Sequence, residues 1–188
     1  LDATELQPWL RGLFAQGRYI RNIGLAPDNR IAYLYPLEGN ESALGLYYPD
    51  FAEQWPRVQH IIANRAPQLD GPLNLVQGGR GLVYRVPVYL QDQRYWGLIS
   101  TVIDYDRLMA YLDALARQRD LAIALLPFDA PAAASAGNVR LPVSLAGAKW
   151  QLQVSSTSQP LVALTLARAL GWSLALLITC LAAWMMRL

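Results

Sequence analysis

Two β-rich runs, residues 82–90 and 94–103, constrain the fold of this chain more than any other feature of its sequence. Only the three polar residues 91–93 separate them, and a connection this short joins neighbouring antiparallel strands. Side chains alternate along a strand, so the first run divides into two sets: Leu82, Tyr84, Val86 and Val88 on one face, and Val83, Arg85 and Tyr89 on the other. The sequence therefore predicts a β-hairpin within an antiparallel sheet.

The N-terminal part predicts a helix followed by a second hairpin. Residues 6–14 have helical spacing, with Pro8 in the first turn, where proline is tolerated. Residues 21–25 and 31–35 are strand candidates, and the turn dipeptides within 26–29 join them. We expect the apolar stripe of the helix to contact a second copy of the chain, or else to pack on its own domain; it consists of Leu6, Leu10, Leu13 and Phe14.

A second helix is predicted over residues 51–65, where apolar residues recur at steps of three and four: Phe51, Trp55, Val58 and Ile62. Asp50 and Glu53 resemble a capping box at its start. Pro56 would remove a backbone hydrogen bond from a helix that began there, because proline has no N–H. The helix therefore begins near Gln54 or bends at that point.

The second half of the chain predicts another helix and a small sheet. Asp104 is placed to cap a helix that ends near Asp120 and carries arginines in its last turn. Three short strand candidates follow, at residues 121–126, 139–145 and 149–154. Residues 129–138 contain too little apolar side chain to pack and are predicted to be a loop. The fold class is therefore α/β (α+β), with a larger unit, a connecting helix and a smaller β-rich unit.

An uncharged run near the end, residues 169–186, lies between Arg168 and Arg187 and has tryptophans near both ends. Its length and composition predict a transmembrane helix, and the alternative is a buried core helix. Arginine on both flanks leaves its orientation undecided. The single cysteine, Cys180, falls inside this run, so no disulfide is expected within the chain.

Composition and spacing argue against several functional classes. A net charge of +2 with scattered basic residues gives no basis for nucleic-acid binding. The single histidine, His60, has no cysteine or second histidine at metal-binding spacing, so neither a zinc site nor a catalytic triad is predicted. The glycine-rich stretch 77–81 lacks the lysine and spacing of a phosphate-binding loop and leads into a strand. We therefore predict no catalytic residues, metal or cofactor.

Four blocks carry a family resemblance: YPLEGNESALGL at 35–46, GPLNLVQGGRG at 71–81, VPVY at 86–89 and WG at 96–97. Together they resemble a CHASE domain from about Tyr19 to about Leu108. The resemblance implies a non-catalytic sensory module of bacterial receptor histidine kinases and diguanylate cyclases. Its arrangement divides the chain into the end of a stalk helix (1–17), a membrane-distal PAS-like ligand-binding unit (18–103), a connecting helix (104–120), a membrane-proximal PAS-like unit (121–160) and a transmembrane helix with its flanks (161–188).

The resemblance also suggests ligand-binding residues in the first unit. By position in the matched blocks, Tyr47 stands where the plant receptors of this family hold a purine with an aspartate. Leu69 corresponds to an apolar wall of their pocket, and Gly78 lies near a pocket threonine. Tyr47 lacks the carboxylate, which puts purine binding in doubt, but adds an aromatic wall with a hydroxyl. The remaining polar or amphipathic candidates are Gln77, Arg80, Tyr84 and Arg85.

Three functions follow as hypotheses. The first is a periplasmic input domain, anchored in the bacterial inner membrane, that binds an unknown small molecule as a homodimer and signals through the membrane helix to a diguanylate cyclase or histidine kinase. The second is a periplasmic protein-interaction or dimerisation domain without a small ligand, and the third is an enzyme. An internal cavity in the larger unit would favour the first, and a filled core with an exposed apolar patch the second.

Overall fold

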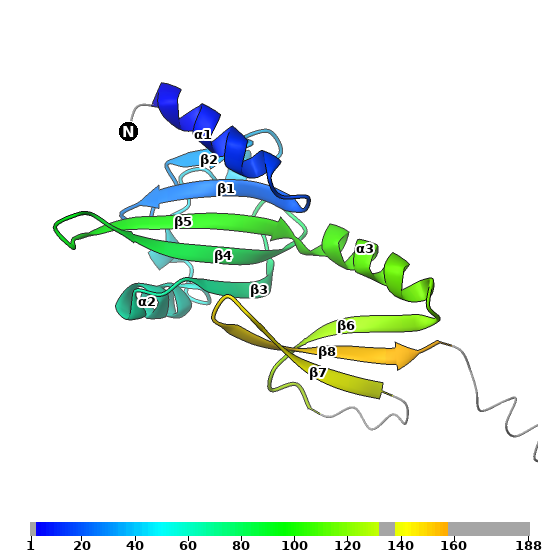
Figure 1. Ribbon diagram of the computed structural model, residues 1–188. Coiled ribbons are helices and arrows are strands. Elements are labelled where there is room, and N and C mark those ends of the chain that lie inside the picture. Colours follow the sequence, from blue (N-terminus) through cyan, green and yellow to red (C-terminus); the bar gives the residue numbers. More distant parts are fainter. Residues whose placement is uncertain (1–2, 132–137, 158–188) are drawn as a thin grey trace, which may run out of the picture.

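Two antiparallel sheets form the framework of the chain (Figure 1). The computed structural model describes residues 3–131 and 138–157. Within them, a five-stranded sheet has the order β2-β1-β5-β4-β3 and a three-stranded sheet has the order β6-β8-β7. We call these parts the large unit and the small unit. The mixed α/β class and the antiparallel sheets predicted from the sequence are confirmed.

The helices and strands follow the predicted order, with one strand that the sequence analysis missed, β3. Three helices connect or cover the sheets: α1 (Ala3–Ala15), α2 (Trp55–Asn64) and α3 (Tyr105–Arg117). The large sheet consists of β1 (Ile20–Pro27), β2 (Tyr33–Tyr35), β3 (Gln68–Asn74), β4 (Arg80–Tyr89) and β5 (Tyr95–Asp104). The small sheet consists of β6 (Leu121–Pro127), β7 (Asn138–Leu145) and β8 (Ala148–Ser156).

The predicted hairpin is the pair β4 and β5, in which Val86 lies opposite Ile99. The predicted alternation also holds. Leu82 packs with Tyr105 and Trp150 on the outer face, towards α3 and the small unit. Residues of opposite parity on the same strand, such as Val83 and Arg85, face the other side of the sheet, which is covered by α2 and by the chain between β2 and α2. The large sheet therefore has two covered faces.

The first hairpin has a longer connection and a shorter second strand than predicted, since its last paired residues are Leu25 and Tyr33. Within this connection Asp28 and Asn29 both adopt positive φ, at 49° and 68°, in a tight turn closed by a bond from the N–H of Arg30 to the carbonyl of Pro27 at 3.0 Å. Strand β2 begins at Tyr33 and not at residue 31, because the backbone of Ile31 pairs elsewhere. Its N–H donates to the carbonyl of Leu46 at 2.9 Å, and its carbonyl accepts from the N–H of Gly45 at 2.8 Å.

Helix α2 begins at Trp55, after Gln54, which is the later start that Pro56 suggested. The predicted capping box was wrong. Asp50 ends a short 3₁₀ turn, Tyr48–Asp50, and no side chain caps α2. With Pro56 in the first turn, the missing N–H costs no helix bond, since the first N–H groups of a helix have no partner inside it.

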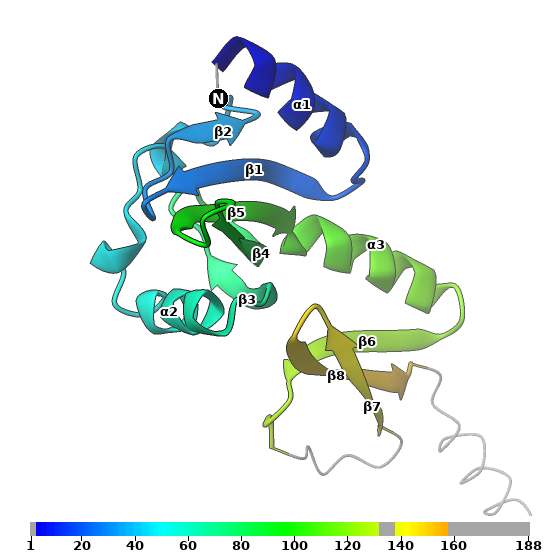
Figure 2. The ribbon, with the colours of Figure 1, turned by 60° about the vertical axis from the view of Figure 1, so that its left-hand side comes forward.

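Helix α1 lies across the outer face of the large sheet near β1 and β2 (Figure 2). Leu6 and Leu10 are buried there against Ile23 and Leu25, and Leu13 and Phe14 pack beside them. The expectation that this stripe contacts a second copy was therefore wrong, because the large sheet already covers it. The alternative, packing on its own domain, is what the structure has.

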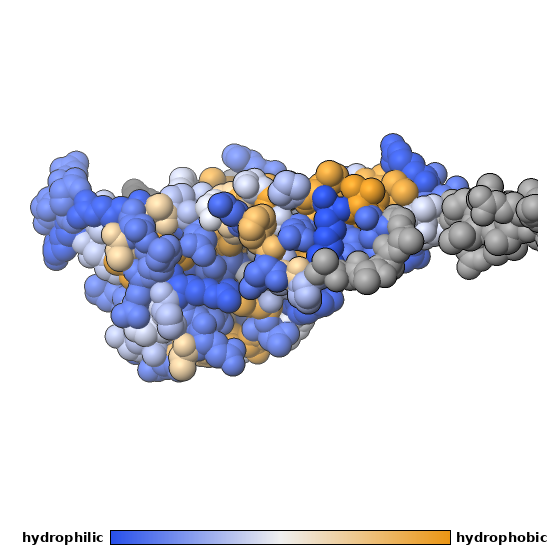
Figure 3. All heavy atoms as spheres, turned by 90° about the horizontal axis from the view of Figure 1, so that it is seen from below, coloured by the Kyte–Doolittle hydropathy of each residue, from blue (hydrophilic) through white to orange (hydrophobic). Residues whose placement is uncertain are grey.

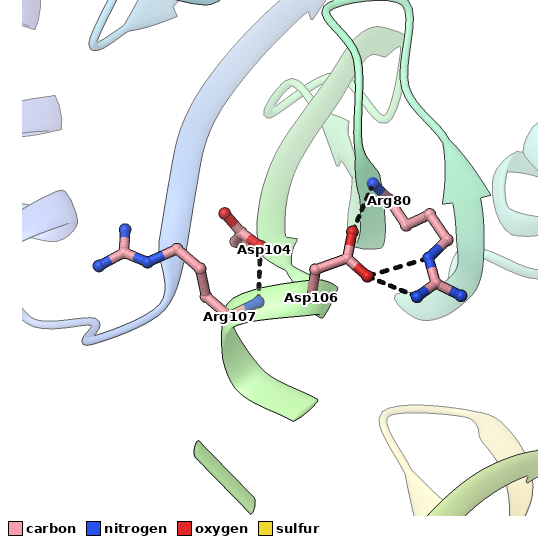
Figure 4. A network of polar contacts seen from close by, with 4 residues as sticks. All are labelled: Arg80, Asp104, Asp106 and Arg107. Carbon is pink, nitrogen blue, oxygen red and sulfur yellow. Dashed lines mark hydrogen bonds and ion pairs between the residues drawn. The ribbon is translucent and has the colours of Figure 1, made fainter. Parts of the chain in front are cut away.

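Helix α3 runs from the end of β5 to the small sheet, and polar contacts fix its first turn (Figure 4). Asp104 caps it as predicted, accepting a hydrogen bond from the N–H of Arg107 at 2.9 Å. Asp106 accepts bonds from the side chain and the backbone N–H of Arg80 at the start of β4. A cluster of Leu69, Leu82, Tyr105 and Trp150 then joins the two units through apolar contacts.

The predicted membrane helix over residues 169–186, together with Cys180, lies outside the described residues. Among the helices within 3–131 and 138–157, none combines the length and the apolar character that crossing a membrane demands.

Candidate ligand-binding site

A small, half-open cavity lies between the inner face of the large sheet and the segments that cover it. Side chains of β1, β4 and β5 form its floor, and residues from two covering segments, 36–54 and 74–77, form its roof. We call these two segments the cover. The cavity measures about 50 Å³, which is room for a few water molecules. Its apolar walls include Ile31, Leu34 and Val83, and polar side chains project among them.

Arg85 is the most unusual group at this cavity, because its side chain is charged and only 2% exposed. The alternation along β4 directs it inward. Its Nη1 donates to Asp70 Oδ2 at 2.9 Å and its Nη2 to Gln54 Oε1 at 2.5 Å. The guanidinium also lies 5.2 Å from the ring centre of Tyr48. The Nε–H has no acceptor among the described residues, so one donor of this buried cation is unused.

A hydroxyl pair forms a second polar point on the cavity wall. Tyr48 Oη and Ser100 Oγ are 2.9 Å apart, and both residues are buried. Ser100 comes from the central strand β5, whereas Tyr48 comes from the 3₁₀ turn of the cover. Either hydroxyl can be the donor, so the pair could offer a ligand one donor or one acceptor without leaving itself unpaired.

An amide cluster around Asn40 ties the cover to the sheet. Asn40 Oδ1 accepts bonds from Asn22 Nδ2 at 2.8 Å, Arg21 Nε at 3.2 Å and Gln77 Nε2 at 3.4 Å. The register of β1 against β5 shifts between Ile20 and Asn22, and such a bulge lets the neighbours Arg21 and Asn22 reach the same partner. Arg21 also donates to the carbonyls of Gln77 and Gly78, at 2.9 Å and 2.6 Å.

Of the seven residues proposed from the sequence, Gln77 and Arg85 line the cavity. Gly78 is adjacent, in the turn between β3 and β4, where its carbonyl accepts from Arg21. Tyr47 does not line the cavity. Its ring lies 4.6 Å from the guanidinium carbon of Arg30 on the outside of the cover, and the next residue in sequence, Tyr48, takes the inward position.

The other three proposed residues lie away from the cavity. Leu69 and Tyr84 belong to the apolar cluster on the outer face of the sheet. Arg80 is exposed and pairs with Asp106, whose carboxyl has a pKa below its ordinary value because of the hydrogen bonds from Arg80. These contacts stabilise the fold around α3 and place no group near the cavity.

The residues that the sequence analysis missed are Asn22, Asn40, Tyr48, Gln54 and Ser100. Asn22 and Ser100 had a usable signal, since each is a polar residue at an inward position of an otherwise apolar strand. The other three lie in the cover, which has little regular structure. No period in the sequence tells which side chain of such a segment points inward.

The groups gathered here are suited to binding. They are amides, hydroxyls and one guanidinium, which donate and accept hydrogen bonds. Within residues 3–131 and 138–157, no three His, Cys, Asp or Glu side chains come together in a way that could hold a metal ion. The single histidine, His60, is exposed on α2, with Asn64 as its neighbour.

Comparison with solved structures identifies similar folds. An extracellular ligand-binding receptor from Desulfohalobium retbaense superimposes with a TM-score of 0.65 at 18% identity over 83% of this chain, which spans only 34% of that protein. The ligand-binding domain of the Pseudomonas aeruginosa amino acid chemoreceptor PctC, solved in complex with GABA, gives a TM-score of 0.52 at 14% identity, covering 82% of this chain and 81% of that one. At these identities the likeness concerns the fold.

No curated protein sequence matches this one. The model of the CHASE domain family matches residues 5–137, which is most of the chain and includes the large unit, α3 and β6. The four sequence blocks had pointed to the same family, and the match adds the N-terminal helix and the beginning of the small unit. The chain therefore belongs to the CHASE domain family of sensory domains.

Proposed function

We propose that this chain is an extracytoplasmic input domain that binds a small polar metabolite in the cavity of the large unit. The observation that carries the proposal is Arg85, a buried cation at a cavity with one N–H unused. A buried donor without an acceptor lowers stability by roughly 1–3 kcal/mol, so a ligand that supplies an acceptor recovers free energy there. The sheet order β2-β1-β5-β4-β3 also suits a PAS-like sensor unit.

The size of the cavity limits how the ligand binds. About 50 Å³ is far below the roughly 300 Å³ or more of an ordinary ligand pocket. Binding therefore requires the cover to move outward from the sheet. The contacts that must adjust are those of Asn40 and Tyr48, which hold the cover to β1 and β5. A ligand that favours the open arrangement shifts the population towards it, by no more than its difference in affinity for the two states.

The chemistry of the walls suggests a ligand with at least one hydrogen-bond acceptor, such as a carboxylate, next to Arg85, and an apolar part against Ile31 and Val83. Asp70 stays paired with Arg85 and so leaves the site close to neutral, which suits an uncharged or zwitterionic molecule. The similar PctC domain was solved with GABA, a small zwitterion, and this makes amino acids the first panel to test.

Thermal unfolding of the chain in the presence of GABA and the common amino acids tests the proposal. A ligand at about 100 times its dissociation constant stabilises the protein by about 2.7 kcal/mol. Ser100→Ala removes a cavity hydroxyl and is expected to weaken binding about fivefold to tenfold. Thr101→Ala is the matched control, because the next residue on β5 faces the opposite side of the sheet. Equal losses of affinity in both variants would place the ligand elsewhere.

The remaining parts of the hypothesis concern the whole receptor. The periplasmic location, the anchor in the inner membrane and the helix over residues 169–186 are proposed from the family resemblance and from that uncharged run. The output is a diguanylate cyclase or a histidine kinase. Reaction of Cys180 with a membrane-impermeant thiol reagent in intact membranes would argue against the membrane helix.

Interaction with another protein, including a second copy, remains the second candidate, and one observation favours it. An apolar groove of about 410 Å³ lies between α1 and the β4–β5 hairpin and is lined by Trp9, Val88, Leu90 and Trp96 among others. Trp9 is 49% exposed there. Sedimentation of the chain over a range of concentrations, compared with Trp9→Ser, tests this. If both proteins were monomeric at all concentrations, the homodimer hypothesis would be ruled out.

A further inference from the structure

A second cleft lies at the junction of the two units, on the other side of the Asp70–Arg85 pair from the cavity. It measures about 510 Å³ and is lined by Leu69 and Asp70 of β3, Arg57 of α2, and the small unit's Phe128, Lys149 and Trp150. Figure 1 shows how the turn between β7 and β8 reaches up towards β3 and α2. A cleft of this volume is large enough for a small organic molecule.

One end of the cleft is held by backbone contact between the units. The N–H of Leu69 donates to the carbonyl of Ala146 at 3.0 Å. Gly147, at φ 79°, packs so closely that a Cβ on it would lie 3.0 Å from the carbonyl oxygen of Pro67. The β7–β8 turn is therefore docked on β3, while the rest of the cleft stays open to solvent.

Positive charge predominates in the cleft. Arg57 and Lys149 are both exposed and form no ion pair with any residue in the described ranges. Lys149 Nζ lies 5.8 Å from the ring centre of Phe128, a contact that keeps the ammonium near the opening. Asp70 already pairs with Arg85, so Asp129 is the one lining carboxylate left to oppose the two cations. The cleft thus presents two unpaired cations beside apolar walls.

Trp150 adds a buried donor. It is 6% exposed, it lines the cleft, and its indole N–H meets no acceptor in the described part of the chain. An enclosed N–H without an acceptor destabilises the arrangement that encloses it. Because the nitrogen itself is covered, an acceptor reaches it only if the small unit shifts slightly against β3.

We propose that this cleft is a second ligand site, which takes a small organic carboxylate with a planar apolar body. The carboxylate lies between Arg57 and Lys149 and accepts from the Trp150 indole N–H, while the apolar body packs against Leu69 and Phe128. Lysine and arginine with an indole donor suit an oxyanion, and the aromatic and aliphatic walls suit the organic part. This inference does not depend on the ligand proposed for the cavity.

The two sites are connected by one ion pair. Asp70 lines the cleft, and its carboxylate bonds to Arg85, which lines the cavity. A carboxylate bound beside Asp70 changes the electrostatic environment of that pair and so changes the affinity of the cavity for its own ligand. By linkage, the cavity ligand changes the affinity of the cleft by the same factor.

The test uses the full chain labelled with ¹⁵N at its tryptophan indoles, with benzoate as the probe. Trp150→Phe identifies the Trp150 resonance among those of the six tryptophans. Benzoate is expected to move that resonance saturably, with a dissociation constant of about 1 mM or less. Inorganic phosphate, which has no apolar body, is expected to move it much less at the same concentration. No movement at about 20 mM benzoate, or equal movement with phosphate, overturns the proposal.

Charge variants test whether benzoate binds in the cleft. Arg57→Gln and Lys149→Gln are each expected to weaken benzoate binding about tenfold, because each removes a charge-assisted contact. Arg94→Gln is the matched control, since Arg94 is an exposed cation on the β4–β5 turn whose loss should leave the affinity unchanged. Ser100→Ala should also leave it unchanged. If Ser100→Ala weakened benzoate binding and the cleft variants did not, benzoate would be a ligand of the cavity and the cleft site would be refuted.

Discussion

The large and small units differ in how completely their sheets are covered. The large sheet is buried on both faces, by α1 on one and by α2 with the cover on the other. In the small unit, Trp150 is the one apolar residue of the described strands that is buried, while Val139, Leu141 and Leu145 of β7 are exposed. Figure 3, viewed from below, shows apolar side chains gathered at the surface on the side of the small unit. The small unit therefore has little core of its own, and its buried tryptophan packs against Leu69 and Leu82 of the large unit.

The largest effect should come from the buried ion pair of the large unit. Asp70→Asn leaves the Arg85 guanidinium buried without its counter-charge, which is expected to cost about 3–5 kcal/mol in the free energy of unfolding. Asp92→Asn breaks the exposed pair with Arg94 and is expected to change it by less than about 0.5 kcal/mol. Urea unfolding measures both. Similar values for the two variants would mean that burial gives the Asp70–Arg85 pair no special role.

The difference in burial between the two units can be tested directly by substituting one leucine in each. Leu98, fully buried in the core of the large unit, should lose about 2–5 kcal/mol of stability on substitution by alanine. Leu141→Ala removes the same atoms from a side chain that is 49% exposed and should cost less than about 1 kcal/mol. A large loss from Leu141→Ala would show that something covers β7 in solution.

A smaller and local effect should appear at the junction. Gly147→Ala places a Cβ against the carbonyl of Pro67 at a positive φ, which is expected to cost about 1–2 kcal/mol. Hydrogen exchange should show lost protection in β7 and β8 with little change in β4 and β5. Gly12→Ala in α1, where a Cβ meets no neighbour, is the control and should be neutral or slightly stabilising. Equal loss in both sheets would show that they unfold as one cooperative unit.

The smallest effect concerns pH. Hydrogen bonds from Arg80 lower the pKa of Asp106, so the pair stabilises the folded state above the unfolded pKa, and this contribution disappears as the pH falls through the folded pKa. The stability difference between the native protein and Arg80→Gln should therefore shrink from about pH 6 to about pH 2. Both groups are exposed, so the difference is small throughout. A difference that grew on acidification would reverse the sign of the pair's contribution.

Local patterns were enough to predict most elements of the fold. The β4–β5 hairpin, the cap at Asp104 and the late start of α2 each depend on residues within one turn or strand. Strand β3 was missed because Gly71 and Pro72 interrupt it, and both residues are poor strand formers. Its pairing with β4 shifts in register between Asp70 and Leu73. This irregularity has no local signal in the sequence.

The candidate site was predicted less well than the fold, for a physical reason. Arg85 could be placed because strand alternation separates it from Tyr84. Tyr47 was chosen over Tyr48 by position in a family block, but these residues lie where the chain enters a 3₁₀ turn, and the turn decides which ring faces inward. Gln54 and Asn40 meet their partners only after the cover folds over the sheet. Contacts of that kind have no local signature.

The Asn40 side chain has one further consequence. Its amide oxygen has two lone pairs but serves three donors, so one of them is always held weakly. The longest of the three contacts is from Gln77, at 3.4 Å. The Gln77 amide can therefore turn to a ligand at the loss of one weak hydrogen bond, while Asn22 and Arg21 still hold Asn40. Asn40 can thus lose its bond to Gln77 when a ligand binds and still connect the cover to β1 through Asn22 and Arg21.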